Sequence, residues 1–146
     1  MLAQGNTTLT EQWNGTAASR NHVFLGDIST WFYRGIAGIN LDPSAPGFAK
    51  IIIRPEVVGD LTWAKAETRT LRGLVQSEWH RETGDLVMTI TIPVNSTATV
   101  YVPAENKDNV TADGATFVRS EGGRQVYTVD SGKYVFTAKG GPNSTL

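Results

Sequence analysis

The first side chains that can do chemistry lie near the start of the chain, in the stretch "TTLTEQWNGTAASRNH" at residues 7–22. Glu11 offers a carboxylate that can take a proton from water, and Trp13 offers an aromatic ring for apolar contact. His22 follows the turn dipeptide Asn14-Gly15, and a neutral imidazole can both donate and accept a hydrogen bond. By residue type alone, Glu11 is more commonly a solvated loop acid, and His22 can equally belong to a helix cap.

Composition argues against several other kinds of site. The chain has 146 residues, no cysteine and two histidines far apart, so we expect no disulfide, no metal site and no cofactor. The formal net charge of -1 gives no support for nucleic acid or an anionic membrane as a partner. No apolar run is long enough to span a bilayer. The length fits one domain, or one domain and a fragment of another.

The elements that must position these side chains begin with one helix, predicted over residues 22–39. Its apolar side chains recur at intervals of three and four, at Leu25, Ile28, Phe32, Ile36 and Ile39. Trp31 and Tyr33 widen the apolar surface almost all the way round, so such a helix needs cover on several sides. We therefore expect it to belong to a larger helical body, with its aromatic side chains packed between helices.

After the break "NLDPSAPG" the pattern changes to about eight short β segments separated by turns. They read "FAKIIIR", "LTWAKAETRT", "LVQSEWHRE", "LVMTITI", "TATVYV", "TFVRS", "RQVYTV" and "KYVFTA". Leu86, Met88 and Ile90 alternate with Val87 and Thr89, as in a strand with one buried face. "ETGDL" and "SEGGRQ" are typical of hairpin turns. These segments predict a mainly β fold, an antiparallel two-sheet β-sandwich of jelly-roll-like type.

The predicted organisation is asymmetric. Residues 1–42 form the last loop and helix of an incomplete helical domain, residues 43–139 the β-sandwich, and residues 140–146 a disordered tail. A single helix that needs partners, followed by a sandwich, indicates the end of a longer protein.

Several of these pieces, taken in order, resemble the C-terminal end of bacterial α-L-rhamnosidases, glycoside hydrolase family 78. They are "TTLTEQW", "NHVFLGDISTWFYRGIAGI", "DPSAPGFAKIIIRPE", "LTWAKAE", "SEW" and "TIPVNSTATVYVPA". The resemblance runs from about residue 7 to residue 104, and more loosely to residue 138. It implies that the helix is the last of a six-hairpin α/α barrel and that the sandwich follows that barrel.

The resemblance also implies an activity, the hydrolysis of terminal α-L-rhamnosyl residues with inversion by two carboxyl groups. The family pattern Thr-Leu-Trp-Glu-x-Trp reads "TLTEQW" here, which assigns the general base to Glu11 and a wall of the sugar site to Trp13. The Asn-His pair before the last barrel helix assigns sugar binding to His22. Thr10 replaces the first Trp of the pattern, so the aromatic surface is thinner.

The implied partners are a rhamnose-containing carbohydrate and the rest of the helical barrel, either upstream in the same chain or on a partner. The general acid belongs to barrel segments that this chain lacks, so we expect the isolated chain to be inactive. Compartment stays open among periplasmic, secreted and cytoplasmic locations in a bacterium.

The alternative function is a non-catalytic carbohydrate-binding or scaffolding β-sandwich module. It needs an exposed aromatic platform, and Trp63 and Trp79 on the predicted strands are its candidates. We expect both of these tryptophans to be core residues, and His80, offset by one position from Trp79, to face solvent. For Arg54, a bond across the junction of barrel and sandwich and an ordinary surface position are equally good interpretations.

Overall fold

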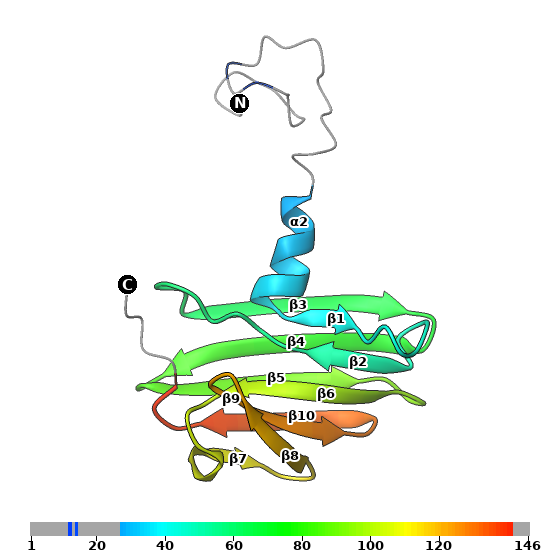
Figure 1. Cartoon of the computed structure of the whole chain (residues 1–146). Helices are drawn as coiled ribbons and strands as arrows, with labels where there is room; N and C mark the ends of the chain where they lie inside the picture. The colour runs from blue at the N-terminus through cyan, green and yellow to red at the C-terminus, as the bar shows by residue number, and fades with distance from the viewer. Residues whose placement is uncertain (1–11, 13, 15–26, 142–146) are drawn as a thin grey trace. The chain divides into compact units, whose positions relative to one another are not determined.

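The computed structural model describes Gln12, Asn14 and residues 27–141 (Figure 1). The chain divides into two compact units, residues 1–32 and residues 33–146. Glu11, Trp13 and His22, the three predicted site residues, lie outside the described residues, as do residues 142–146 of the predicted tail.

The helical segment ends earlier than the sequence predicts. An α-helix, α2, spans Ile28–Trp31, and a π-helical turn, η2, continues it over Phe32–Ile36. Ile39, which the spacing places in the helix, instead begins the first strand, so that part of the prediction is wrong. The reason is Gly38, whose φ of 77° takes the chain out of the helical conformation. Trp31, Phe32 and Tyr33 are each about half exposed, and their packing between helices stays a prediction.

Ten strands follow within the described residues. They are β1 (Ile39–Leu41), β2 (Lys50–Ile53), β3 (Trp63–Thr70), β4 (Gly73–Glu82), β5 (Asp85–Ile92), β6 (Thr97–Pro103), β7 (Val110–Ala112), β8 (Thr116–Glu121), β9 (Arg124–Val129) and β10 (Gly132–Ala138), with a 3-10 turn, η3 (Lys107–Asn109), before β7. The eight predicted segments correspond to β2–β6 and β8–β10. The two additional strands, β1 and β7, have three residues each, too few to show an alternating pattern.

The strands form two sheets of five (Figure 1). The first sheet has the order β1-β2-β6-β9-β8, and the second has the order β3-β4-β5-β10-β7. All neighbouring pairs are antiparallel except β2 and β6, which are parallel. A parallel pair needs a long crossover, and here the chain visits the second sheet through β3, β4 and β5 before it returns. The predicted mainly β two-sheet sandwich is confirmed.

The core lies between the two sheets. Along β5, Leu86, Met88, Ile90 and Ile92 are buried, which confirms the predicted alternation. Burial of each such side chain contributes about 1.5–3 kcal/mol. Tyr127 of β9 packs edge-on against Phe136 of β10 with ring centroids 5.6 Å apart, and joins the two sheets. Desolvation raises the pKa of the Tyr127 hydroxyl above its ordinary value.

The tight turns follow the sequence. Thr83 and Gly84 between β4 and β5 both have positive φ, of 51° and 90°. Gly122 and Gly123 between β8 and β9 do the same, at 55° and 72°. Two consecutive positive φ values are the signature of the two-residue hairpin turn. Both predicted hairpins, "ETGDL" and "SEGGRQ", are confirmed.

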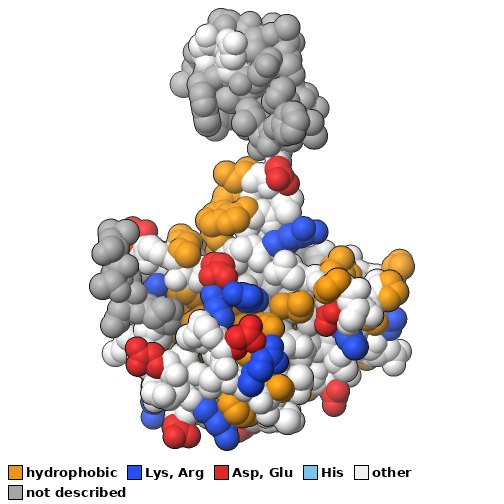
Figure 2. All heavy atoms as spheres, viewed as in Figure 1, with side chains coloured by type: hydrophobic (Ala, Val, Ile, Leu, Met, Phe, Trp, Pro, Cys, Tyr) orange, Lys and Arg blue, Asp and Glu red, His pale blue; other side chains and the backbone are white. Residues whose placement is uncertain are grey.

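The surface is mixed in charge. On the sandwich face turned toward the viewer in Figure 2, Lys and Arg side chains lie among Asp and Glu side chains. Among the described residues, no helix is both long enough and apolar enough to cross a bilayer.

Candidate functional site

The described part of the chain supplies the segment that follows the predicted catalytic loop. This is the junction, residues 33–38 together with the side chains of the sandwich that hold them. All of these residues belong to the second compact unit. The junction determines how firmly the end of the helical segment is attached to the sandwich.

Two side chains of β4 bond the end of the helical segment. The Trp79 indole N–H donates to the carbonyl of Ile36 at 2.8 Å, and the Ser77 hydroxyl donates to the carbonyl of Ala37 at 2.6 Å. Ser77 and Trp79 are two positions apart on one strand, so both point into the core, where both are buried. The last carbonyls of a helix have no partner within it, and here the sandwich core supplies the donors. The prediction that Trp79 is a core residue is confirmed.

Gly38 lets two backbone segments meet. A Cβ atom at this position would lie 2.2 Å from both the carbonyl carbon of Arg54 and the nitrogen of Pro55. The Arg54 N–H donates to the Gly38 carbonyl at 2.8 Å, and the Glu56 N–H donates to the Gly35 carbonyl at 2.9 Å. These two bonds join residues 35–38 to residues 54–56 at a distance that a residue with a side chain could not reach.

Arg124 of β9 bonds residues 55 and 56, the second of the two backbone segments that meet at Gly38. Its guanidinium donates to the carbonyl of Pro55 at 2.7 Å and to Oε2 of Glu56 at 2.6 Å. The Arg124 side chain is only 13% exposed. Burial lowers the pKa of Arg124, while the charge of Glu56 acts in the opposite direction. Arg124 was not among the predicted residues, because an arginine after a Gly-Gly turn has no sequence signal of its own.

Arg54 takes the surface position that the sequence left open. Its guanidinium carbon lies 5.3 Å from the centre of the Tyr101 ring, a cation–π contact. Its Nε is 3.8 Å from a carboxylate oxygen of Glu56, and both side chains are about half exposed. The junction therefore depends on the backbone of Arg54 and on the side chain of Arg124.

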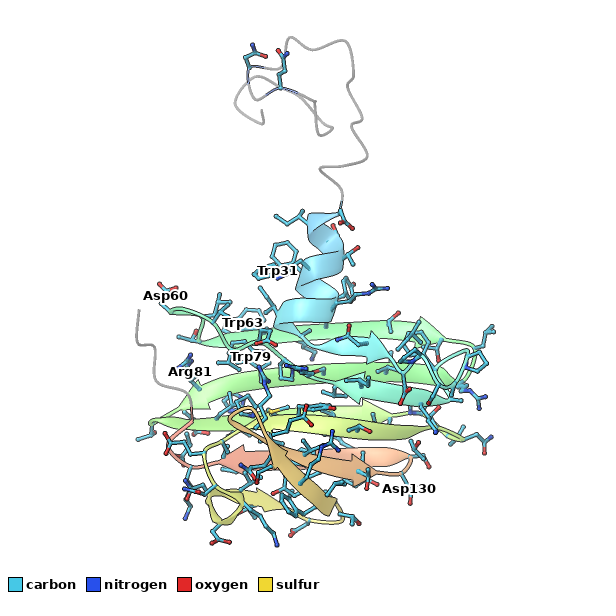
Figure 3. All side chains as sticks on the ribbon, in the orientation of Figure 1. Trp31, Asp60, Trp63, Trp79, Arg81 and Asp130 are labelled. Atoms are coloured by element: carbon cyan, nitrogen blue, oxygen red, sulfur yellow. The ribbon has the colours of Figure 1, made fainter. Side chains whose placement is uncertain are left out.

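The two strand tryptophans differ in their surroundings (Figure 3). Trp63 of β3 is 65% exposed, whereas Trp79 of β4 is fully buried. The prediction that Trp63 is a core residue is wrong. Ala64 pairs with Trp79 and points into the core with it, so Trp63 points outward beside His80. A signal was available, because Trp63 shares its face of the strand with Lys65 and Glu67. The expectation that His80 faces solvent is confirmed, since its side chain is 42% exposed.

A hollow of about 390 Å³ opens at the end of the first sheet. Its lining includes four threonines from β6, β8 and β9: Thr97, Thr99, Thr116 and Thr128. Asp42 is also part of the lining, and its carboxylate accepts the N–H of Ser44 at 2.8 Å. This bond and the Ser44 hydroxyl lower the pKa of Asp42. The hollow shares no residue with the junction and has no aromatic side chain in its lining.

The arrangement at the junction suits mechanical attachment. Its buried donors are an indole, a hydroxyl, backbone N–H groups and the guanidinium of Arg124, and none of these is a general acid or base near neutral pH. Within the described residues no group of three or more His, Cys, Asp or Glu side chains is placed to hold a metal ion.

Comparison with known proteins places this architecture in a class. Residues 1–36 match the family model of the bacterial alpha-L-rhamnosidase six-hairpin glycosidase domain. Residues 38–117 match the model of the bacterial alpha-L-rhamnosidase C-terminal domain. Residue 37 separates the two matches, and its carbonyl accepts the hydrogen bond from the Ser77 hydroxyl. The class is thus a helical-hairpin glycosidase segment followed by a C-terminal β domain.

The individual relatives agree with that class. The chain is 36% identical to an alpha-L-rhamnosidase of Streptomyces avermitilis, over 93% of this chain and 14% of that protein. The crystal structure of the S. avermitilis alpha-L-rhamnosidase complexed with L-rhamnose superposes with a TM-score of 0.83 over 94% of this chain and 14% of that one. For the alpha-L-rhamnosidase from Dictyoglumus thermophilum the TM-score is 0.79 at 32% identity, over 95% and 17%. The chain belongs to the bacterial α-L-rhamnosidase family, and it spans about one-seventh of the length of the S. avermitilis relative.

Proposed function

We propose that this chain is the C-terminal portion of an inverting α-L-rhamnosidase that removes terminal α-L-rhamnosyl residues from glycosides or polysaccharides. The observation that carries the proposal is the order of the two family matches, with the hairpin glycosidase segment directly before the C-terminal domain. The relative crystallised with L-rhamnose, at 36% identity, supports the sugar.

In this proposal Glu11 is the general base. Inversion requires one carboxylic acid to protonate the leaving oxygen and one carboxylate to activate a water on the opposite face of the sugar. Glu11 takes the second role, His22 bonds the sugar, and Trp13 lines the site. The general acid comes from the rest of the barrel, so the 146-residue chain alone is inactive.

The sandwich serves this chemistry as a brace. Catalytic groups must be held to within about 0.5 Å of their working geometry. Ser77 and Trp79 bond the end of the helical segment and Arg124 bonds the adjoining backbone at Pro55, and each of these bonds is at or below 2.8 Å. We assign the chain before β1 to the barrel, since β1 (Ile39–Leu41) pairs with β2 in the first sheet, and we assign the chain from β1 to residue 139 to the sandwich and residues 140–146 to a tail.

The test uses the longer protein that contains the barrel. Glu11→Gln should lower kcat for an aryl α-L-rhamnoside by about 10²–10⁴-fold with little change in KM, because the base acts in the transition state. Asp130→Asn, a carboxylate on the sandwich, serves as the matched control and should leave kcat unchanged. The anomeric form of the first product, followed by NMR, should be inverted. Retention of configuration, or full activity of the Glu11 variant, would contradict the proposal.

A second candidate is the non-catalytic carbohydrate-binding or scaffolding module, and the exposure of Trp63 favours it. The two candidates differ in a direct measurement. A module leaves the longer protein without hydrolytic activity, whereas the enzyme hydrolyses α-L-rhamnosides and requires the barrel for any turnover.

A further inference from the structure

Trp63 is the most exposed of the tryptophans in the described chain. Tryptophan is strongly buried on average, so a ring that is 65% exposed at the start of an edge strand calls for a physical account. The alternation of β3 fixes its direction, because Ala64 and Ala66 pack against the core on the opposite side. The ring therefore stands on the outer face of the second sheet.

The backbone that carries this ring is held in place before any ligand arrives. Trp63 pairs with His80 in the β3–β4 ladder. The preceding loop is held by Arg81 (Figure 3), whose side-chain Nε donates to the Leu61 carbonyl at 3.1 Å and whose backbone N–H donates to the Thr62 carbonyl at 2.8 Å. A ring on a preorganised backbone loses little conformational entropy on binding.

Charged and polar side chains surround the ring on the same face. Lys65 pairs with Glu78 at 3.4 Å, and His80 lies 3.6 Å from Glu82. Alternation places all of these residues outward. We call this set of five the Trp63 face: Trp63, Lys65, Glu78, His80 and Glu82. It combines one apolar indole ring with hydrogen-bond donors and acceptors, all accessible to water.

The chemistry of this face matches a pyranose better than an apolar protein surface. A sugar ring offers an apolar side that can stack on an indole, and its hydroxyls can bond the imidazole, ammonium and carboxylate groups around it. An apolar protein surface in the same place would desolvate the Lys65–Glu78 ion pair and the polar contact between His80 and Glu82, which is unfavourable. A hydrated ligand leaves both pairs in contact with water.

We propose that the Trp63 face is a saccharide-binding site, made of none of the predicted catalytic residues, that stacks a pyranose of a rhamnose-containing glycan on Trp63. The identity of the sugar rests on the function proposed above, whereas stacking on Trp63 does not. L-Rhamnose is a 6-deoxy sugar, and its methyl group adds apolar area for the indole. The site would retain an extended substrate near the enzyme between cleavage events.

The experiment is a titration of the complete ¹⁵N-labelled 146-residue chain with L-rhamnose and with a rhamnose-containing oligosaccharide. The Trp63 indole resonance is identified as the signal absent from Trp63→Phe. It should shift saturably, and Trp63→Ala should weaken binding by about tenfold or more. Leu71→Ala is the matched control, since Leu71 is a fully exposed apolar residue in the turn at the other end of β3, and it should bind like the unaltered chain.

Two results would overturn the inference. One is an indole signal of Trp63 that does not move at saturating oligosaccharide. The other is protection of Trp63 from acrylamide quenching in the longer protein without sugar, which would identify the face as a contact with another part of that protein. The variant His80→Ala gives a second measurement should Trp63→Ala fold poorly. Because binding is read without turnover, loss of hydrolytic activity and loss of this site are separate outcomes.

Discussion

The two faces of the second sheet each carry a tryptophan, and these two tryptophans have different roles. Trp79 lies in the core and bonds the carbonyl of Ile36, which ends the helical segment. Trp63, one register position away on the neighbouring strand, lies in solvent beside ionised side chains. The inner face of the sheet bonds the junction, and the outer face exposes an aromatic ring and polar side chains to water. A one-residue offset in a strand separates the two roles, because side chains alternate between faces.

Changes on the inner face should therefore alter stability, and changes on the outer face should alter binding. The largest effect is expected at Gly38, where the backbone of the junction meets the segment at Arg54 and Pro55. Gly38→Ala should lower the free energy of unfolding by about 3–5 kcal/mol, from the strain of a positive φ and from the displaced backbone. Urea denaturation followed by circular dichroism measures it.

Gly47→Ala is the control for that variant. Gly47 also has a positive φ, of 63°, but a Cβ there has open space around it. It should lose about 1–2 kcal/mol from backbone conformation alone. Equal losses for the two variants would show that close approach at Gly38 contributes nothing.

The same substitution at the two tryptophans should have unequal effects on stability. Trp79→Phe removes the indole N–H, leaves the Ile36 carbonyl unbonded and opens a small cavity, so we expect a loss of about 2–4 kcal/mol. Trp63→Phe should change stability by less than about 0.5 kcal/mol, because its ring is largely in water. Thermal and urea unfolding of the pair measures the difference, and comparable losses would refute the division between the two faces.

A smaller effect is expected at the second clamp of the junction. Arg124→Lys keeps the charge but cannot bond both the Pro55 carbonyl and the Glu56 carboxylate with the same geometry, so we expect a loss of about 1–2 kcal/mol. Arg119→Lys, an exposed pair with Glu121 on the same sheet, is the control and should show no measurable loss. Urea midpoints of the two variants at one pH test the difference, and an equal response would mean that burial of Arg124 is unimportant.

The smallest effect concerns pH. The pKa of Asp42 is lowered by the Ser44 N–H and hydroxyl, so its folded-state pKa lies below the unfolded value. The resulting stabilisation is present above the unfolded-state value, near 3.8, and is lost as the pH falls through the lower folded-state pKa. Asp42→Asn should therefore be slightly less stable at neutral pH and indistinguishable from the unaltered chain in strong acid. Urea midpoints of both chains, measured from pH 7 into the acid range, check this. A stability difference between the two chains that grows in acid would contradict the predicted direction.

Local pattern predicted much of this fold. Eight strands were recognisable because each has enough residues to show alternation, and both hairpins because Gly84 and the pair Gly122-Gly123 suit positive φ. The strands β1 and β7 were missed because three residues contain too little periodicity. The prediction for Trp63 is wrong although Lys65 marks its face, because residue type favours burial of a large aromatic ring whereas the alternation of the strand turns position 63 outward.

The residues of the candidate site also fall into two groups, those predicted from sequence motifs and those found only in the structure. Glu11, Trp13 and His22 came from motif order and stay predictions. Arg124, Ser77 and Gly38 could not be found from the sequence, because each acts on a segment far along the chain: Arg124 on Pro55, 69 positions away, and Ser77 on Ala37, 40 positions away. The residues next to them in the sequence carry no information about such distant contacts.

By itself, then, the sequence determined the β-sandwich, its eight longer strands, its hairpins and the resemblance to α-L-rhamnosidases. All of these are encoded in residues close together or in motifs kept in order. The tertiary structure alone decided that the core of the sandwich bonds the helix end through Trp79 and Ser77, that glycine is required at position 38, and that Trp63 is displayed to solvent. These depend on the register between strands and on the distance between two backbones, which are set only when segments far apart in the chain pack together.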